Sequence, residues 1–138
     1  MRRYTPRMKP ALGKLSPEEA IALGRRVLDI ESRAVAALSE RLDASFADAV
    51  RLVLACEGRV VVSGIGKSGH VGNKIASTLA STGTPAFFVH PAEASHGDLG
   101  MITEQDIMIA LSNSGESAEL VTIVPLAKRR GAKIVAIT

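Results

Sequence analysis

Aromatic residues and cysteine are scarce in this sequence. Its 138 residues include no Trp, one Tyr, three Phe and one Cys. Few aromatics argue against a surface that stacks nucleic-acid bases, and they leave the core to Ala, Val, Ile and Leu, as is typical of helices packed on a parallel sheet. The single cysteine, Cys56, excludes an internal disulfide and fits a reducing compartment, so we expect a cytoplasmic protein. Cys56 lies in an apolar helical stretch and is expected to pack there rather than act as a nucleophile.

Long apolar runs are also missing. No run reaches the length of a membrane span, and the N-terminus lacks the hydrophobic segment of a signal peptide. We therefore expect neither a membrane nor a nucleic acid as a partner.

Acidic residues are absent from the first fourteen positions, where five Lys and Arg occur. Taking these five charges from the formal total of +3 leaves −2 for the rest of the chain, which is mildly acidic. We interpret residues 1–14 as a disordered basic leader, with an anion-binding arm as the alternative. Residues 15–138 are predicted to form the folded domain.

Two helices are predicted ahead of any strand. Ser16-Pro17-Glu18-Glu19 supplies an N-cap, a proline at the first helical position and a capping-box glutamate. That helix should continue to about Leu42, and a second should run from about Ser45 to Glu57, before Gly58. One stripe of the first helix is apolar and suits packing against a partner subunit or against its own domain: Leu23, Val27, Ile30, Ala34 and Leu38.

From Val60 onward, short apolar strands alternate with helices. The predicted strands are 60–63, 86–89, 107–111 and 134–137, and the predicted helices are 68–82 and 117–130. Pro125 should kink or split the last helix, because it removes a backbone donor. The predicted fold is an α/β three-layer sandwich, a parallel sheet flanked by helices and preceded by one long and one shorter helix. Since a parallel strand normally leads to another helix, we expect the N-terminal part of a longer domain.

The first strand runs into a glycine-rich turn, Gly64-Ile65-Gly66-Lys67-Ser68-Gly69. Its glycine spacing matches the dinucleotide fingerprint, but the acid that should hold a ribose is missing at the end of the second strand, and the nearest one is Glu93. Gly66-Lys67-Ser68 also reproduces the end of a phosphate-binding Walker loop. Val61 stands where that loop needs its first glycine, so neither nucleotide interpretation is favoured.

A second turn, Ser112-Asn113-Ser114-Gly115-Glu116-Ser117, follows another apolar strand. Two small-residue turns at strand ends, with hydroxyls and one lysine, favour a phosphate pocket. Hydrogen bonds to a charged group contribute about 1.5–3 kcal/mol each and a helix dipole roughly 0.3–1 kcal/mol, so the hydroxyls should set specificity. Helix capping is the alternative, but it explains one of the three serines. The predicted phosphate- and substrate-binding residues are Gly66, Ser68, Ser112, Asn113, Ser114 and Ser117.

The candidate catalytic residues are Lys67, Glu119 and His96, with Asp98 beside the histidine. Glu119 should lie in the first turn of a helix, either as a favourable acid near the dipole or as a general base facing the pocket. His96 lies in a long connection, where it serves either the loop or the chemistry. The three histidines lack the spacing of a zinc site, so no metal site is predicted.

With these motifs in place, the chain resembles the sugar isomerase (SIS) domain family and, within it, the arabinose 5-phosphate isomerases. The resemblance covers about residues 23–138. Its specific parts are the first glycine-rich turn extended to His70, the segment 80–85, the segment His90–Met101 and the second turn. The second turn is general to the domain family, whereas His90–Met101 points to the arabinose 5-phosphate branch.

This resemblance implies an isomerase that interconverts D-ribulose 5-phosphate and D-arabinose 5-phosphate through an enediol, without a redox cofactor. The product feeds synthesis of 3-deoxy-D-manno-octulosonic acid for lipopolysaccharide. Family members assign catalytic roles at the positions of Lys67 and Glu119, a histidine near the site at His96, and phosphate binding at the three serines of the second turn. They assemble as homotetramers, with active sites formed between subunits.

The sequence also departs from the family. Members continue with further catalytic residues and often with paired CBS regulatory domains, and neither occurs here. We therefore expect the 138-residue chain alone to be inactive or nearly so. A non-catalytic sugar-phosphate sensor and an isomerase of another phosphosugar remain alternative interpretations.

Overall fold

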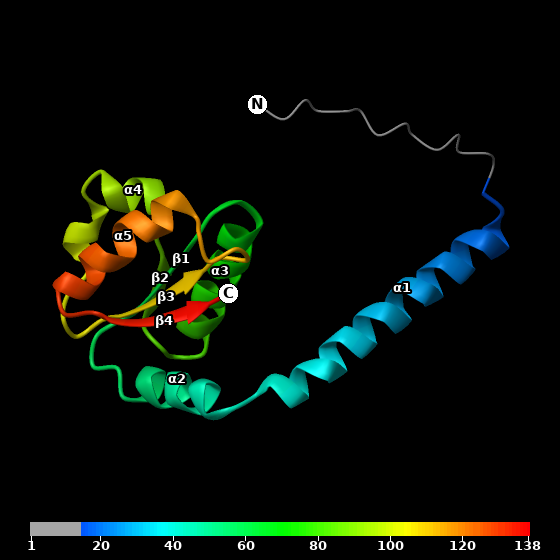
Figure 1. The fold of residues 1–138 in the computed structure, drawn as a ribbon, viewed down its shortest axis with the longest axis horizontal. Helices are drawn as coiled ribbons and strands as arrows, with labels where there is room; N and C mark the ends of the chain where they lie inside the picture. The colour runs from blue at the N-terminus through cyan, green and yellow to red at the C-terminus, as the bar shows by residue number, and fades with distance from the viewer. Residues whose placement is uncertain (1–14) are drawn as a thin grey trace. The chain divides into compact units, whose positions relative to one another are not determined.

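The structure, a computed structural model, describes residues 15–138, and the chain divides between Asp43 and Ala44 into two compact units. The described part of the first unit holds a long helix, α1 (Pro17–Ala37), and a 3-10 turn, η1 (Leu38–Arg41) (Figure 1). The second unit starts with α2 (Ala44–Leu54) and contains the sheet. The leader predicted for residues 1–14 lies outside the described residues, and the domain boundary after it stays a prediction.

The capping box at the start of α1 is confirmed. Ser16 Oγ accepts a hydrogen bond from the Glu19 amide at 3.1 Å, and the Glu19 carboxylate accepts one from the Ser16 amide at 2.8 Å. These two bonds satisfy donors that a helix start otherwise leaves open. The helix predicted to reach Leu42 ends earlier because its last turn tightens into η1.

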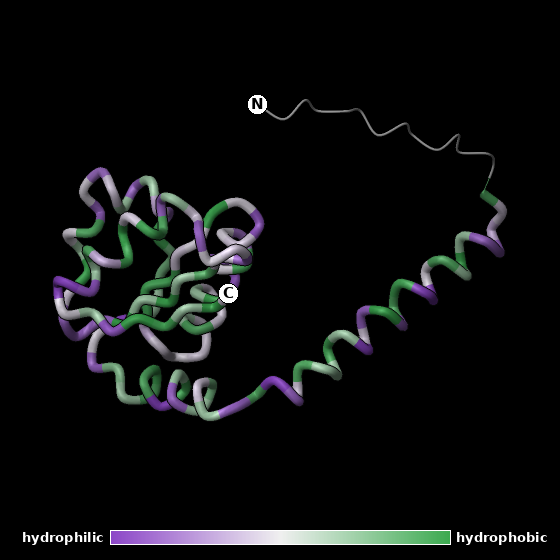
Figure 2. The backbone as a smooth tube through the Cα atoms, viewed as in Figure 1, coloured by the Kyte–Doolittle hydropathy of each residue, from purple (hydrophilic) through white to green (hydrophobic). Residues whose placement is uncertain are grey.

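Four parallel strands form the sheet, as predicted. They are β1 (Val60–Gly64), β2 (Ala86–Phe88), β3 (Ile107–Leu111) and β4 (Lys133–Ile137), in the order β2-β1-β3-β4. β1 and β3 are buried along their whole length, which explains their uninterrupted apolar sequences. Figure 2 shows this concentration of hydrophobic residues in the strands.

Helices cover both faces of the sheet, so the predicted three-layer sandwich is confirmed. On one face, Val60 and Val62 of β1 pack with Ala76 of α3 (Gly66–Ser81). On the other face, Val61 packs with residues of α4 (Pro91–Ser95) and α5 (Ala118–Arg129) (Figure 1). The alternation along β1 follows from the two-residue period of a strand.

The structure corrects three local predictions. The connection expected to be a loop contains α4 and a 3-10 turn, η2 (Asp98–Met101). α3 begins at Gly66 rather than Ser68, so Lys67 lies in its first turn rather than before it. α5 runs through Pro125 without being split, and it has buried residues on both sides of the proline: Leu120, Ile123 and Ala127. Among residues 15–138, none of the helices combines the length and apolar character needed to cross a bilayer.

Candidate functional site

The two small-residue turns lie next to each other at the carboxyl edge of the sheet. Gly64, the last residue of β1, lies opposite Leu111, the last residue of β3. The following helices, α3 and α5, leave for opposite faces of the sheet. Such a point, where neighbouring strands send their connections to opposite sides, is where open α/β sheets form ligand-binding crevices.

The first turn holds α3 close against β1. A Cβ atom at Gly69 would lie 2.7 Å from the carbonyl oxygen of Gly64, so only glycine allows this approach. Gly66 has a φ of +57°, a left-handed conformation that glycine adopts without strain. Lys67 follows it and is exposed, while Ser68 is half-buried. The N-cap residue Ile65 makes no side-chain capping bond, which leaves the α3 amino end without a capping side chain.

The second turn is closed by its own serines. Ser112 Oγ lies 2.9 Å from Ser117 Oγ, and Ser114 Oγ accepts a hydrogen bond from the Glu116 amide at 3.2 Å. Ser117 is the N-cap of α5, yet its side chain makes no capping hydrogen bond. The capping explanation for the serines is therefore wrong in the described structure. Ser112 and Ser117 instead bond to each other, and the amino end of α5, whose dipole favours an anion, has no capping side chain.

The histidine segment, His90–Met101, starts after β2 at the same, carboxyl edge of the sheet. His90 follows β2 and caps α4, its Nδ1 accepting a hydrogen bond from the Ala92 amide at 3.3 Å. Ser63, fully buried at the end of β1, donates from Oγ to the Val89 carbonyl at 2.8 Å. This hydrogen bond was not predicted from the sequence, although Ser63 stands out as the polar residue that follows three valines in the strand. His96 ends α4 and is exposed.

The remaining predicted site residues lie on the same helices and turns. Glu119 is exposed in the first turn of α5, and Asn113 is exposed in the second turn. The register of β1 and β3 thus brings together the turns that carry Lys67 and the serines. No hydrogen bond or ion pair between the described residues joins Lys67, Glu119 and His96. Within residues 15–138 there is also no group of three His, Cys, Asp or Glu side chains placed to hold a metal ion.

A buried carboxylate occupies the opposite, amino edge of the sheet. Asp106, just before β3, accepts hydrogen bonds from the amides of Arg59 (2.7 Å) and Thr103 (2.8 Å). Burial raises the pKa of Asp106, but these bonds, together with bonds from the Arg59 and Thr103 side chains, outweigh burial and hold the pKa below its ordinary value. Asp106 is therefore a structural anchor, remote from the two turns.

Comparison with known proteins finds relatives that are named arabinose 5-phosphate isomerases. The SIS domain profile matches residues 53–138. Arabinose 5-phosphate isomerase KdsD of Pseudomonas aeruginosa is 60% identical over 114 residues, which cover 83% of this chain and 35% of that protein. Arabinose 5-phosphate isomerase GutQ of Escherichia coli is 54% identical over 121 residues, covering 88% and 38% respectively. The chain thus spans about a third of the length of these curated relatives.

Among solved structures, an Escherichia coli protein in complex with arabinose 5-phosphate superimposes with a TM-score of 0.82 at 40% identity. The match covers 88% of this chain and 64% of that one.

Proposed function

The chain belongs to the SIS domain family, and from that premise we propose that the whole protein is an aldose–ketose isomerase that interconverts D-ribulose 5-phosphate and D-arabinose 5-phosphate. The observation that carries the proposal is the pairing of the Lys67 turn with the serine turn across β1 and β3, at the switch point of the sheet. The names of the similar isomerases support this substrate over other phosphosugars. The product would supply 3-deoxy-D-manno-octulosonic acid synthesis for lipopolysaccharide.

In this proposal the second turn binds the phosphate group. The proposed donors are the Ser114 hydroxyl, one hydroxyl of the Ser112–Ser117 pair, whose other hydroxyl donates within the pair, and the first amides of α5. An anion there gains hydrogen bonds and the favourable dipole together. Gly66 and Ser68, in the first turn of α3, are the proposed contacts on the other side, and Asn113 is assigned to a sugar hydroxyl.

The proposed chemistry is a proton transfer between carbons 1 and 2. The Glu119 carboxylate takes a proton from carbon 1 of ribulose 5-phosphate, and the electrons form an enediolate with negative charge on the carbon 2 oxygen. The Lys67 ammonium group stabilises that charge. The aldose forms when Glu119 returns the proton to carbon 2 and the proton of the carbon 1 hydroxyl is transferred to the carbon 2 oxygen, which leaves a carbonyl group at carbon 1. His96 is the third candidate, assigned to moving the hydroxyl protons.

Binding is tested by titrating the 138-residue chain with arabinose 5-phosphate while following its thermal unfolding midpoint. A ligand that binds only the native state raises the unfolding midpoint as the ligand concentration increases. At a hundred times the dissociation constant, binding adds about 2.7 kcal/mol to the free energy of unfolding. Unphosphorylated arabinose and NAD are the matched controls, and both should leave the midpoint unchanged. A rise with NAD instead of the phosphosugar contradicts the proposal in favour of a dinucleotide site.

Turnover separates the isomerase from a non-catalytic sugar-phosphate sensor. Conversion of arabinose 5-phosphate to ribulose 5-phosphate is assayed with the whole protein and, in parallel, with the 138-residue chain, whose inactivity alone stays a prediction. Binding without turnover by the whole protein identifies a sensor.

We also propose that the protein self-associates through α1. No side chain of α1 is buried, although the helix repeats apolar residues along its length (Figure 2). Leu23, Val27 and Ile30 are each about half exposed, at 51%, 51% and 56%. An exposed apolar stripe of this kind is typical of a protein–protein contact. A homotetramer is the assembly we propose.

Replacing Ile30 with glutamate should weaken this self-association at least tenfold, because a charge in an apolar contact loses its hydration. Sedimentation velocity of the chain over a range of concentrations measures the effect. Ser32→Glu, which places the same charge two residues further round the helix, is the control. Equal assembly of both variants and the unmodified chain would exclude the stripe as the contact.

A further inference from the structure

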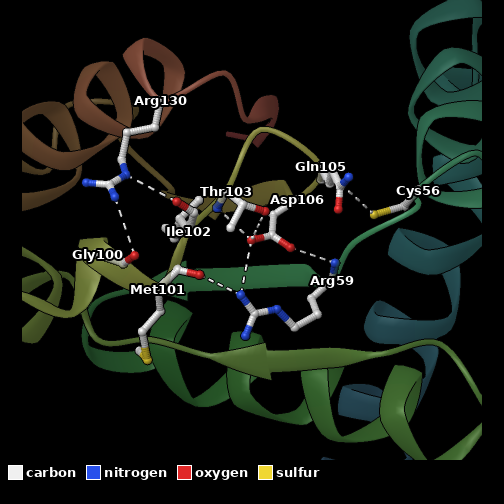
Figure 3. Close-up of polar contacts among 9 residues, drawn as sticks. All are labelled: Cys56, Arg59, Gly100, Met101, Ile102, Thr103, Gln105, Asp106 and Arg130. Atoms are coloured by element: carbon white, nitrogen blue, oxygen red, sulfur yellow. Dashed lines mark hydrogen bonds and ion pairs between the residues drawn. The ribbon is translucent and has the colours of Figure 1, made fainter.

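Two arginines from distant parts of the chain bind three consecutive carbonyl groups (Figure 3). Arg130 donates from Nε to the Ile102 carbonyl at 3.1 Å and from Nη2 to the Gly100 carbonyl at 3.4 Å. Arg59 donates from Nη2 to the Met101 carbonyl between them at 2.5 Å. We call Arg59 and Arg130 the arginine clamp. It satisfies carbonyls at the end of η2, which the 3-10 turn itself leaves without partners.

Contacts with the sheet fix the Arg59 side chain, which also binds the Met101 carbonyl. Its guanidinium group forms an ion pair with Asp106 at 3.3 Å and lies 5.0 Å from the centre of the Phe87 ring. Asp106 is buried and accepts bonds from two amides as well, so it cannot move without breaking them. Of the two arginines of the clamp, Arg59 is therefore held at the sheet by its ion pair with Asp106.

The clamp lies at the end of the segment that carries His96. The front of that segment is held by the Ser63–Val89 bond and by buried Pro91 and Ala94. Between Ala94 and the clamp, His96 and Asp98 are exposed, and their side chains have no hydrogen bond or ion pair with another described residue. Their backbone is held by the bond from the His96 amide to the Glu93 carbonyl at 3.0 Å and by buried Leu99, and the clamp fixes the carbonyls that follow.

We propose that Arg130 is a positioning residue for His96, acting through the carbonyls of Gly100 and Ile102; the inference rests on the isomerase function proposed above. Arg130 is the C-cap residue of α5, the helix whose first turn carries Glu119. One helix therefore carries the proposed base at its amino end and fixes the histidine segment at its carboxyl end. The Met101 carbonyl is bound by Arg59 as well, so the end of the segment is fixed to α5 and to the start of β1.

The test compares Arg130→Met with Arg129→Met. Methionine keeps much of the apolar stem and removes the donors, and both variants lose the same charge from neighbouring exposed positions of the chain. The 15N relaxation order parameters of His96, Gly97 and Asp98 and the His96 imidazole shifts are measured in the 138-residue chain. The kcat and KM for arabinose 5-phosphate are measured in the whole protein. Arg130→Lys, which retains the charge and one donor group, is the second variant.

We expect Arg130→Met to lower the order parameters at residues 96–98 and to reduce kcat about tenfold with little change in KM, since small displacements of a reacting group are costly. Arg129→Met should change neither quantity, and Arg130→Lys should restore part of both. Unchanged order parameters and imidazole shifts in Arg130→Met overturn the inference, as do equal effects of the two methionine variants. If the unmodified whole protein lacks isomerase activity, the proposed function fails, while the relaxation data still decide whether Arg130 positions His96. If Arg130→Met does not fold, Arg130→Lys with unchanged relaxation and kcat overturns the inference.

Discussion

Replacing Lys67 with alanine is expected to lower kcat of the whole protein about 10²–10³-fold, the loss typical for removing one group that stabilises a developing oxyanion. Lys67 is exposed in the first turn of α3 and packs in neither core cluster, so the fold should survive the change. Steady-state kinetics with arabinose 5-phosphate measure the effect, and circular dichroism establishes that the variant is folded.

Lys74→Ala is the matched control for Lys67→Ala. Lys74 is exposed on the same helix and carries the same charge, but it lies beyond the first turn. Its replacement should leave kcat within about twofold, because exposed charges at that distance are screened by salt. Lys67→Arg keeps the charge while moving the donors, so it separates electrostatic stabilisation from the placement of the ammonium group. A kcat for Lys67→Ala equal to that of Lys74→Ala would remove Lys67 from the proposed mechanism.

Replacing Asp106 with alanine is expected to lower the free energy of unfolding by about 3 kcal/mol. The substitution leaves the amides of Arg59 and Thr103 without their acceptor and the Arg59 guanidinium group without its ion-pair partner. Breaking a buried ion pair by removing one partner typically costs about 3–5 kcal/mol. We expect a loss at the lower end of that range because the Arg59 side chain is 43% exposed, so water can solvate it. Urea denaturation of the 138-residue chain measures the difference.

Asp48→Ala controls for the loss of a carboxylate as such. Asp48 forms an ion pair with Arg51 at 2.6 Å, but both side chains are largely exposed. Exposed pairs contribute about 0–1 kcal/mol, so this variant should be nearly as stable as the unmodified chain. Comparable losses in the two variants would show that the bonds to Asp106 contribute no more than a surface pair.

The pH dependence of stability gives an independent test of Asp106. Its pKa is lower in the folded chain than its ordinary value of 3.8, so the unfolded state takes up the proton first as the pH falls. The stabilisation is therefore complete well above pH 3.8 and is lost as the pH falls through the folded pKa. Asp106→Asn, which cannot ionise, should lack this component of the acid-induced loss. An unchanged acid profile in Asp106→Asn would contradict the lowered pKa.

Local sequence patterns predicted most of the secondary structure and the two turns. The strand at Ile107–Leu111 has the bounds predicted for it, because a run of buried apolar residues leaves little ambiguity. The Ser16 capping box predicted the start of α1 for a similar reason, since all its bonds lie within four residues. α4 was missed because a five-residue helix is too short to show a helical period, although Pro91 at its first position was a signal.

Long-range contacts were not predictable from the sequence. Asp106 and Arg59 are 47 positions apart, and Arg130 lies 28 positions from Ile102, so no local pattern connects them. The Ser112–Ser117 bond was predictable only in part. The sequence places both serines in one turn, but their bond to each other depends on the conformation of that turn. With Ser117 bonded to Ser112, α5 has no capping side chain.

The central place of β1 in the sheet constrains how the chain reaches its native state. Val60 must pair both with Ala86 and, across a much longer separation, with Ile107. Closing such long loops costs conformational entropy before the strand contacts can offset that cost, so sheets of this kind fold slowly. During synthesis, at about 5–20 residues per second, β1 is made seconds before β3. For that interval the edge of β1 that will pair with β3 is open, and the Lys67 turn has been made while the serine turn that will lie beside it has not.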